Sequence, residues 1–339
     1  MPMDWNFATT LIGSQPYKNS VEAIDKTLDG RITCPSWPQL PARGYKEGMY
    51  VQTGAHLPGL KIEGDKAVVD LNDYDPTEAY MAILNDDVDY FVYPPDLYAG
   101  FFELLERDVK DFQAVKGQVT GPISEGLQIL DAGDRPVIYD ESYGEIVRKT
   151  VNMSAKWQAK RLSSMNSNVI IFFDEPSLSM LGTPFASISD EQAKDWINEA
   201  LEGVDCYRGV HCCGNTNWPL LLSTNIDILS LDAYQYADNL IMFPDELTEF
   251  YEKGGAVAWG IVPSSDENIE KETVESLVAR MESVFDKMEE KGINRQKAAV
   301  QSMITPQCGL GLVAEENVDK VLDLLKGVSE ALKQRYGLQ

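Results

Sequence analysis

Eight short apolar segments recur along the chain, and charged segments with apolar residues at helical spacing separate most of them. A short apolar run predicts a buried strand, and strands that alternate with helices predict a parallel sheet. Eight such units favour a (β/α)8 TIM barrel over an open sheet. The expected strands are residues 7–13, 88–94, 113–121, 168–174, 207–213, 226–232, 255–262 and 298–304.

The chain has 339 residues, which exceeds the ~250 that are typical of this barrel. An insertion near residues 35–75, with a hairpin around Gly64-Asp65 in residues 60–71, and extra helices in residues 123–165 explain the surplus. The clearest helices are expected at 190–203 and 271–292. We therefore expect a single TIM-barrel domain over residues 1–339.

Net charge limits the partners of this chain. The formal charge of −25 repels nucleic acid and anionic membranes, although a cationic partner surface stays open. No apolar run approaches the ~20 residues of a membrane span, and the N-terminal segment lacks the pattern of a secretory signal. Five cysteines without a disulfide-rich spacing indicate free or metal-bound thiols. We expect a cytoplasmic protein.

A histidine and two cysteines are candidate metal ligands. His211 and Cys213 are two residues apart on an expected strand and so share a face, whereas Cys212 points away. Cys308 follows the last expected strand, and strand ends meet at one rim of a barrel. One nitrogen and two sulfur donors suit Zn²⁺, with Asp232 or an open fourth position. The alternatives are a buried-core coincidence and, for Asp232, a helix cap.

Two further rim residues suit an amino-acid substrate. Asp174 ends an apolar strand and could bind an ammonium group, unless the sequence Asp174-Glu175-Pro176 only caps a helix. Ser14 could donate to a carboxylate, unless it belongs to an ordinary turn. Zinc at such a rim could activate water or hold a substrate thiol as thiolate, and composition does not choose between these reactions.

Six segments together resemble the C-terminal catalytic barrel of cobalamin-independent methionine synthase. That barrel is related to uroporphyrinogen decarboxylase and to the methylcobalamin-dependent methyltransferases. The resemblance runs from about residue 5 to the C-terminus in the order of the family. The segments are TTLIGSQP (9–16), GQVTGPIS (117–124), FFDEPSL (172–178), VHCCGN (210–215), LSLDAY (229–234) and TPQCGLG (305–311).

The resemblance implies roles for particular residues. The zinc ligands would be His211, Cys213, Asp232 and Cys308, of which the acidic one is usually Glu in full-length synthases. The homocysteine contacts would be Ile12, Ser14 and Asp174. A further family glutamate has no clear counterpart here, and Glu47 is our candidate for it.

Two departures from the full-length synthases concern the methyl donor. The chain leaves no room for their second barrel, which helps to hold methylfolate. Val262 also stands where they place a proton-donating histidine. Both features resemble the short, single-barrel core methionine synthases, which take methyl from a methylcorrinoid. His56 lies in GAHLPG rather than in a corrinoid-anchoring motif, so methylcobalamin is expected from solution or on a corrinoid carrier protein.

The sequence thus predicts a zinc methyltransferase that converts homocysteine to methionine. One alternative is the same reaction on coenzyme M, which has a sulfonate and would leave Asp174 without an ammonium partner. A second alternative is a uroporphyrinogen decarboxylase-like enzyme, whose substrate carries many carboxylates. Only Arg31 and Arg43 lie in the first hundred residues to bind such a substrate. A zinc-storing or corrinoid-docking module would bind metal without turnover.

Overall fold

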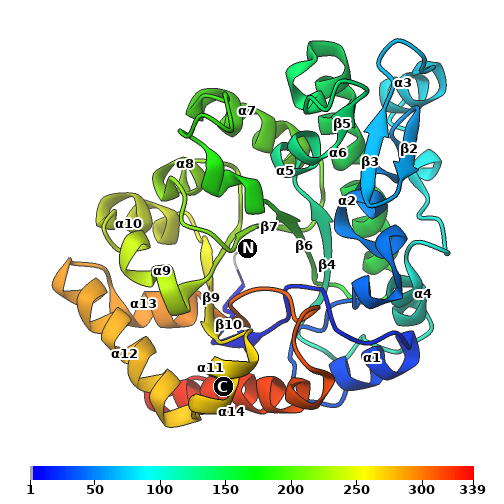
Figure 1. The fold of residues 1–339 in the computed structure, drawn as a ribbon. Helices are drawn as coiled ribbons and strands as arrows, with labels where there is room; N and C mark the ends of the chain where they lie inside the picture. Colours follow the sequence, from blue (N-terminus) through cyan, green and yellow to red (C-terminus); the bar gives the residue numbers. More distant parts are fainter. Residues whose placement is uncertain (1–2) are drawn as a thin grey trace.

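The computed structural model describes residues 3–339 and contains a curled parallel sheet of seven strands. Figure 1 shows these strands around the centre of the molecule with helices outside them. The sheet order is β1-β10-β9-β8-β7-β6-β4. The strands are β1 (Ala8–Thr9), β4 (Val115–Thr120), β6 (Val169–Asp174), β7 (Tyr207–Cys212), β8 (Ile228–Leu231), β9 (Ala256–Val262) and β10 (Ser302–Pro306).

One of the eight predicted strands, residues 88–94, is absent from the described residues, and β1 and β10 differ in extent from residues 7–13 and 298–304. Residues 88–94 form the 3-10 helix η4 (Val88–Phe91), because Pro94 and Pro95 follow and cannot donate to a ladder. Residues 298–300 belong to the helix α13 (Arg295–Val300), so β10 begins later than expected. The fold is α/β with a seven-stranded curled sheet.

An irregular segment lies between β1 and β4, where an eighth strand would close the sheet. Residues 33–39 accept from and donate to both neighbours, for example Cys34 N to Thr9 O at 2.9 Å and Lys116 N to Pro35 O at 2.8 Å. Pro35 and Pro38 have no N–H, which prevents a regular ladder here. Side chains therefore contribute to holding this segment, as described below.

Two apolar layers separate the inside of the curled sheet from its outside. The inner cluster contains no helix residue and includes Phe172 and Ile170 of β6 and Ile228 of β8. The outer cluster packs the alternate strand residues against the helices. The principal helices of that layer are α1 (Ser20–Thr27), α4 (Ala99–Leu105), α5 (Pro122–Gln128), α6 (Glu141–Ser163), α7 (Asp190–Leu201), α8 (Trp218–Leu222), α9 (Ala233–Leu240), α10 (Pro244–Glu252), α11 (Asp266–Lys271), α12 (Val274–Glu290) and α14 (Glu315–Tyr336).

The predicted hairpin and extra helices are confirmed. β2 (Leu60–Glu63) and β3 (Lys66–Val69) pair antiparallel around Gly64, whose φ of 63° suits a residue without a side chain. They form a separate small sheet with β5 (Leu130–Asp131), next to α3 (Thr77–Leu84) and outside the ring of strands (Figure 1). The short helix α2 (Met49–Thr53) precedes this sheet and contacts β4.

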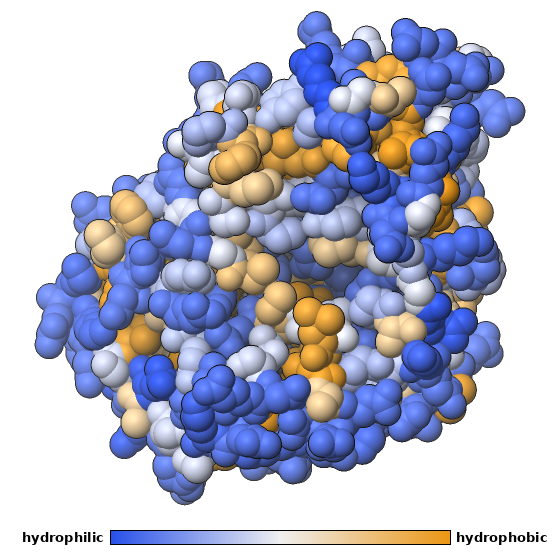
Figure 2. All heavy atoms as spheres, in the orientation of Figure 1, coloured by the Kyte–Doolittle hydropathy of each residue, from blue (hydrophilic) through white to orange (hydrophobic). Residues whose placement is uncertain are grey.

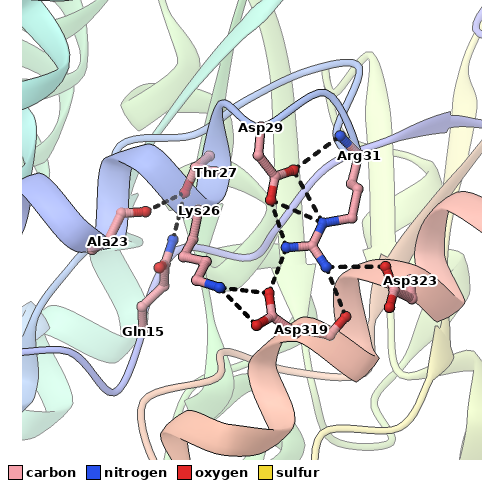
Figure 3. A network of polar contacts seen from close by, with 8 residues as sticks. All are labelled: Gln15, Ala23, Lys26, Thr27, Asp29, Arg31, Asp319 and Asp323. Atoms are coloured by element: carbon pink, nitrogen blue, oxygen red, sulfur yellow. Dashed lines mark hydrogen bonds and ion pairs between the residues drawn. The ribbon is translucent and has the colours of Figure 1, made fainter.

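An ion-pair network joins the two ends of the sequence (Figure 3). The Arg31 guanidinium, whose side chain is 15% exposed, binds Asp29, Asp319 and Asp323. Lys26 of α1 also binds Asp319 of α14, at 2.6 Å. These contacts fasten α14 to the segment after α1. They also occupy Arg31, one of the two arginines considered above for a substrate with many carboxylates.

No helix within residues 3–339 combines the length and apolar character that a bilayer crossing requires.

Candidate active site

Strand alternation places the candidate ligands of β7 on opposite faces, as predicted. His211 lies on the inner face at the end of β7 and is buried, two residues after Gly209. Cys212 belongs to the outer apolar cluster and is fully buried there. Cys213 returns to the inner face. The sequence VHCCG therefore supplies two inward donors rather than three.

The structure brings His211, Cys213 and Cys308 together. Their ligand atoms all lie within 4.8 Å of one another. Cys308 follows β10, which is separated from β7 in the sheet by β8 and β9, so curling of the sheet is what brings the second sulfur close. The prediction that these distant segments converge is confirmed.

The donor set fits zinc in its chemistry and in its supporting contacts. The His211 Nδ1 atom lies 2.9 Å from Ser230 Oγ, a contact that fixes the ring orientation. Its Nε2 atom is buried and has no hydrogen-bond partner. A buried ring nitrogen without a partner is costly unless a ligand uses it, and one nitrogen with two sulfurs is a common zinc set. Outer contacts such as that of Ser230 typically orient metal-binding histidines.

The two thiols of this group influence each other. The neighbouring Cys213 thiol lowers the pKa of Cys308 to about 4, and His211 acts in the same direction, against the effect of burial. The same contact with Cys308, followed by burial, raises the pKa of Cys213. The outer Cys212 differs, because burial raises its pKa to about 12. Thiolate is the form that binds a metal, so Cys308 is the thiol best prepared to bind one.

A cavity of about 130 Å³ lies next to these three residues. It is lined by Ile12, Ser14, Asp174, His211, Cys213 and Cys308, among others. Apolar walls come from Trp37, Met49, Tyr98 and Val119, and side-chain amides come from Gln39, Gln52 and Gln118. In the space-filling view the middle of the molecule is hollowed, with pale and apolar side chains around the hollow and a mostly hydrophilic rim (Figure 2). A larger depression of about 1270 Å³ lies at the opposite ends of the strands, around Trp5 and Tyr207, far from these ligands.

Asp174 ends β6 beside His211 in the strand register. Its Oδ1 atom is buried and has no hydrogen-bond partner, so it can accept from a ligand in the cavity. Burial raises the pKa of Asp174 to about 6, while Lys116 and His211 oppose that rise. An arriving ammonium group would favour the ionised carboxylate.

Ser14 lies at the other side of the cavity. Its hydroxyl accepts from Gly311 N at 3.3 Å, and its carbonyl accepts from Leu310 N at 2.8 Å. A side chain on Gly309 would place its Cβ 2.0 Å from Ser14 Oγ, so only glycine allows this approach. The segment after Cys308 is thereby fastened to the turn that contains Ser14.

Asp232 is near the cluster but is not one of the three close ligands. It begins α9 as its cap, and its carboxylate accepts from Gln235 N at 3.0 Å. Gln307 Nε2 lies 3.1 and 3.2 Å from its two oxygens. The helix-cap alternative is therefore present in the structure, and a metal-binding role for Asp232 stays a prediction.

Glu47 does not line the cavity. Its carboxylate pairs with Arg43, and its carbonyl accepts from Gln39 Nε2 at 2.5 Å. Burial raises the pKa of Glu47, and Arg43 acts against this. Gln39 lines the cavity and Glu47 does not, so a substrate role for Glu47 has no support from its position.

Glu175 acts on the scaffold. It accepts from Ile123 N at 2.9 Å, from Ser124 N at 2.7 Å and from Ser124 Oγ at 2.6 Å, at the start of α5. This arrangement orients the β6 end beside Asp174. Of the two acidic residues in the sequence DEP, one therefore faces the cavity and the other holds a helix.

Sequence reasoning missed Lys116. This lysine is the second residue of β4 and is fully buried. Burial lowers the pKa of Lys116 to about 8, and Asp174 opposes that change. The signal was available, because a lysine inside an apolar strand is uncommon and needs polar partners.

Comparison with known proteins gives a shared fold. No protein-family profile and no curated protein matches the chain. A B12-independent methionine synthase from Shewanella sp. W3-18-1, solved in complex with selenomethionine, superposes with a TM-score of 0.61 at 16% identity, over 97% of this chain and 98% of that one. A methyltransferase from Methanosarcina mazei gives 0.58 at 14% identity, over 99% and 94%. At these identities the likeness concerns the α/β fold of the chain.

Proposed function

We propose that this protein is a zinc-dependent methyltransferase that converts homocysteine to methionine, with a methylcorrinoid as methyl donor. One observation carries the proposal. The group His211, Cys213 and Cys308 borders a cavity whose other polar residues include Asp174 and Ser14. A metal-ligand set beside an anion and a hydroxyl matches a substrate that is both a thiol and an amino acid.

The metal ligands are prepared by their neighbours. Ser230 fixes the His211 ring so that Nε2 faces the group, and Cys213 and Cys308 supply the sulfurs. Zinc held there would keep a substrate thiol in the thiolate form at neutral pH, where a free thiol near pKa ~8.5 is mostly protonated. The chain's contribution is a cavity with apolar walls, which would limit competition from water.

The amino-acid part of the substrate would be bound by Asp174 and Ser14. The unpartnered Oδ1 of Asp174 would accept from the ammonium group. Ser14 already accepts from Gly311 N, so its own hydroxyl hydrogen is free for the carboxylate. Binding at two points orients the sulfur toward the methyl donor, and such orientation contributes strongly to rate.

Leaving-group chemistry supports a methylcorrinoid as the proposed methyl donor. Val262 is fully buried at the end of β9, where the resemblance would place a proton-donating histidine. In transfer from a methylcorrinoid, a sulfur–carbon bond forms and the cobalt–carbon bond breaks with its electron pair staying on cobalt. The thiol proton goes to solvent. This leaving group requires no protonation, which suits a site with an apolar residue there.

The test combines metal content with turnover. Purified protein is expected to contain one zinc and to form methionine from homocysteine and methylcobalamin. Cys308→Ser is expected to lose both properties, whereas Cys206→Ser, a half-buried cysteine outside the group, keeps them. Absence of methionine with either free methylcobalamin or a methylated corrinoid protein would refute the proposal. Methylation of coenzyme M in place of homocysteine would show that coenzyme M is the methyl acceptor.

A further inference from the structure

Lys116 has an environment that the proposed reaction leaves unexplained. Its Nζ lies 2.6 Å from Ile12 O and 3.2 Å from Gln118 Oε1, and it sits 4.6 Å from the centre of the Phe172 ring. Both hydrogen-bond acceptors are neutral. A fully buried ammonium is costly even with the charge of Asp174 acting in its favour, so its retention on two neutral hydrogen-bond acceptors indicates a specific task.

The first contact controls the turn that forms one side of the cavity. Ile12 immediately precedes Gly13 and Ser14, and all three line the cavity. A hydrogen bond from a charged donor is stronger than a neutral one. The Lys116 bond to Ile12 O therefore fixes the turn from below, while Leu310 N and Gly311 N hold Ser14 from the other side.

The second contact continues into the irregular segment between β1 and β4. Gln118 accepts from Lys116 through Oε1 and donates from Nε2 to Trp37 O at 3.1 Å. A side chain on Gly13 would place its Cβ 2.7 Å from the Gln118 amide, which shows how closely the turn packs on this residue. The two prolines of segment 33–39 limit its backbone hydrogen bonds, so these side-chain contacts replace part of the missing ladder.

We propose that Lys116 is a positioning residue that fixes the turn Ile12–Ser14 and thereby sets the affinity for the amino-acid part of the substrate. This inference rests on the proposed function for its substrate. It separates two parts of the site, because the metal ligands come from β7 and the segment after β10. Loss of the lysine is expected to disturb recognition of the amino acid while the ligand group stays in place.

The test is Lys116→Met, which keeps most of the length of the side chain and removes its donors. We expect KM for homocysteine to rise at least tenfold, kcat to change less than twofold and zinc content to stay at the wild-type value. With 2-mercaptoethanol as acceptor, kcat/KM should change less than twofold, because this thiol has no amino-acid group. Lys160→Met, an exposed lysine of α6, is the control and is expected to behave as wild type.

Hydrogen exchange measures the positioning without turnover. In Lys116→Met, peptides covering residues 9–16 and 33–39 are expected to exchange faster, with unchanged exchange around residues 207–213. Unchanged KM together with unchanged exchange at 9–16 would overturn the inference, and so would joint loss of zinc and kcat, which would show a general structural role.

Lys116→Gln, which keeps an amide donor, provides the same readout if the methionine variant does not fold. If wild type methylates no homocysteine, the proposed function fails, while the exchange result still decides whether Lys116 fixes the turn.

Discussion

The contact between Ser230 and His211 offers a quantitative test of the proposed metal site. In the wild-type protein the His211 Nδ1 atom lies 2.9 Å from the Ser230 hydroxyl, inside the buried site. Ser230→Ala removes this partner. An unsatisfied buried polar group costs about 1–3 kcal/mol. Loss of an outer contact to a metal-binding histidine typically reduces metal affinity ~10–100-fold. The two ranges agree, because such a factor corresponds to about 1.4–2.7 kcal/mol.

The assay is a competition titration of the metal-free protein against a chromogenic zinc chelator. The expected result is a 10–100-fold weaker zinc affinity, on the scale just given for outer contacts. Ser302→Ala is the matched control, since Ser302 is equally buried on β10 and its hydroxyl contacts Trp259 Nε1 at 2.9 Å and Ala298 O at 2.7 Å. Its loss removes a buried hydroxyl without touching His211.

One result would refute the reasoning. If Ser230→Ala and Ser302→Ala bind zinc equally well and within twofold of wild type, His211 does not depend on Ser230 to serve as a ligand. Circular dichroism of each metal-free variant checks that both have folded.

Three further predictions concern stability. Arg31→Gln removes the contact with Asp319 and is expected to lower the free energy of unfolding by about 1 kcal/mol, and by less at high salt. Zinc content should stay the same, and a loss of zinc would contradict this prediction. Burial raises the pKa of Glu125, whose two oxygens have no hydrogen-bond partner. Glu125 therefore stays protonated in the folded protein at pH values where it ionises in the unfolded chain. As the pH rises above the pKa of the unfolded state, the folded protein loses stability. Glu125→Gln is therefore expected to raise Tm at pH 8 and to have little effect near pH 4.5, and equal shifts at both pH values would be inconsistent with this. Gly309→Ala forces a Cβ 2.0 Å from Ser14 Oγ and is expected to cost about 1–3 kcal/mol, with Ser14→Gly in the same chain restoring Tm; no restoration would exclude this clash as the cause.

Periodicity predicted the strands that carry the site better than it predicted their number. β4, β6, β7, β8 and β9 lie within a residue or two of their expected bounds, because each is a short and mostly buried segment. Residues 88–94 have a similar composition but end in Pro94, which Pro95 follows. Residues 33–39 occupy a strand position despite containing two prolines. Local sequence does not encode which of two such segments docks at the open edge of a sheet.

The site was predictable where it depends on alternation and not where it depends on side-chain contacts across the fold. The inward placement of His211 and Cys213 follows from a period of two. By contrast, Gln307 donates a hydrogen bond to the carboxylate of Asp232, and Arg43 forms an ion pair with Glu47. Residue spacing in the sequence does not predict either contact. Lys116 could have been noticed as a charge in an apolar strand, but its link to Ile12 required the structure.

The position of Cys308 also affects the order of events during folding. It follows β10, the last strand of the sheet, and β10 pairs with β1 on one side and with β9 on the other. A chain still emerging from the ribosome, or one whose C-terminal segment has not docked, presents only His211 and Cys213. Tight metal binding by all three residues would therefore require that the first and last strands have paired. Metal content would then indicate which copies of the protein have completed their sheet.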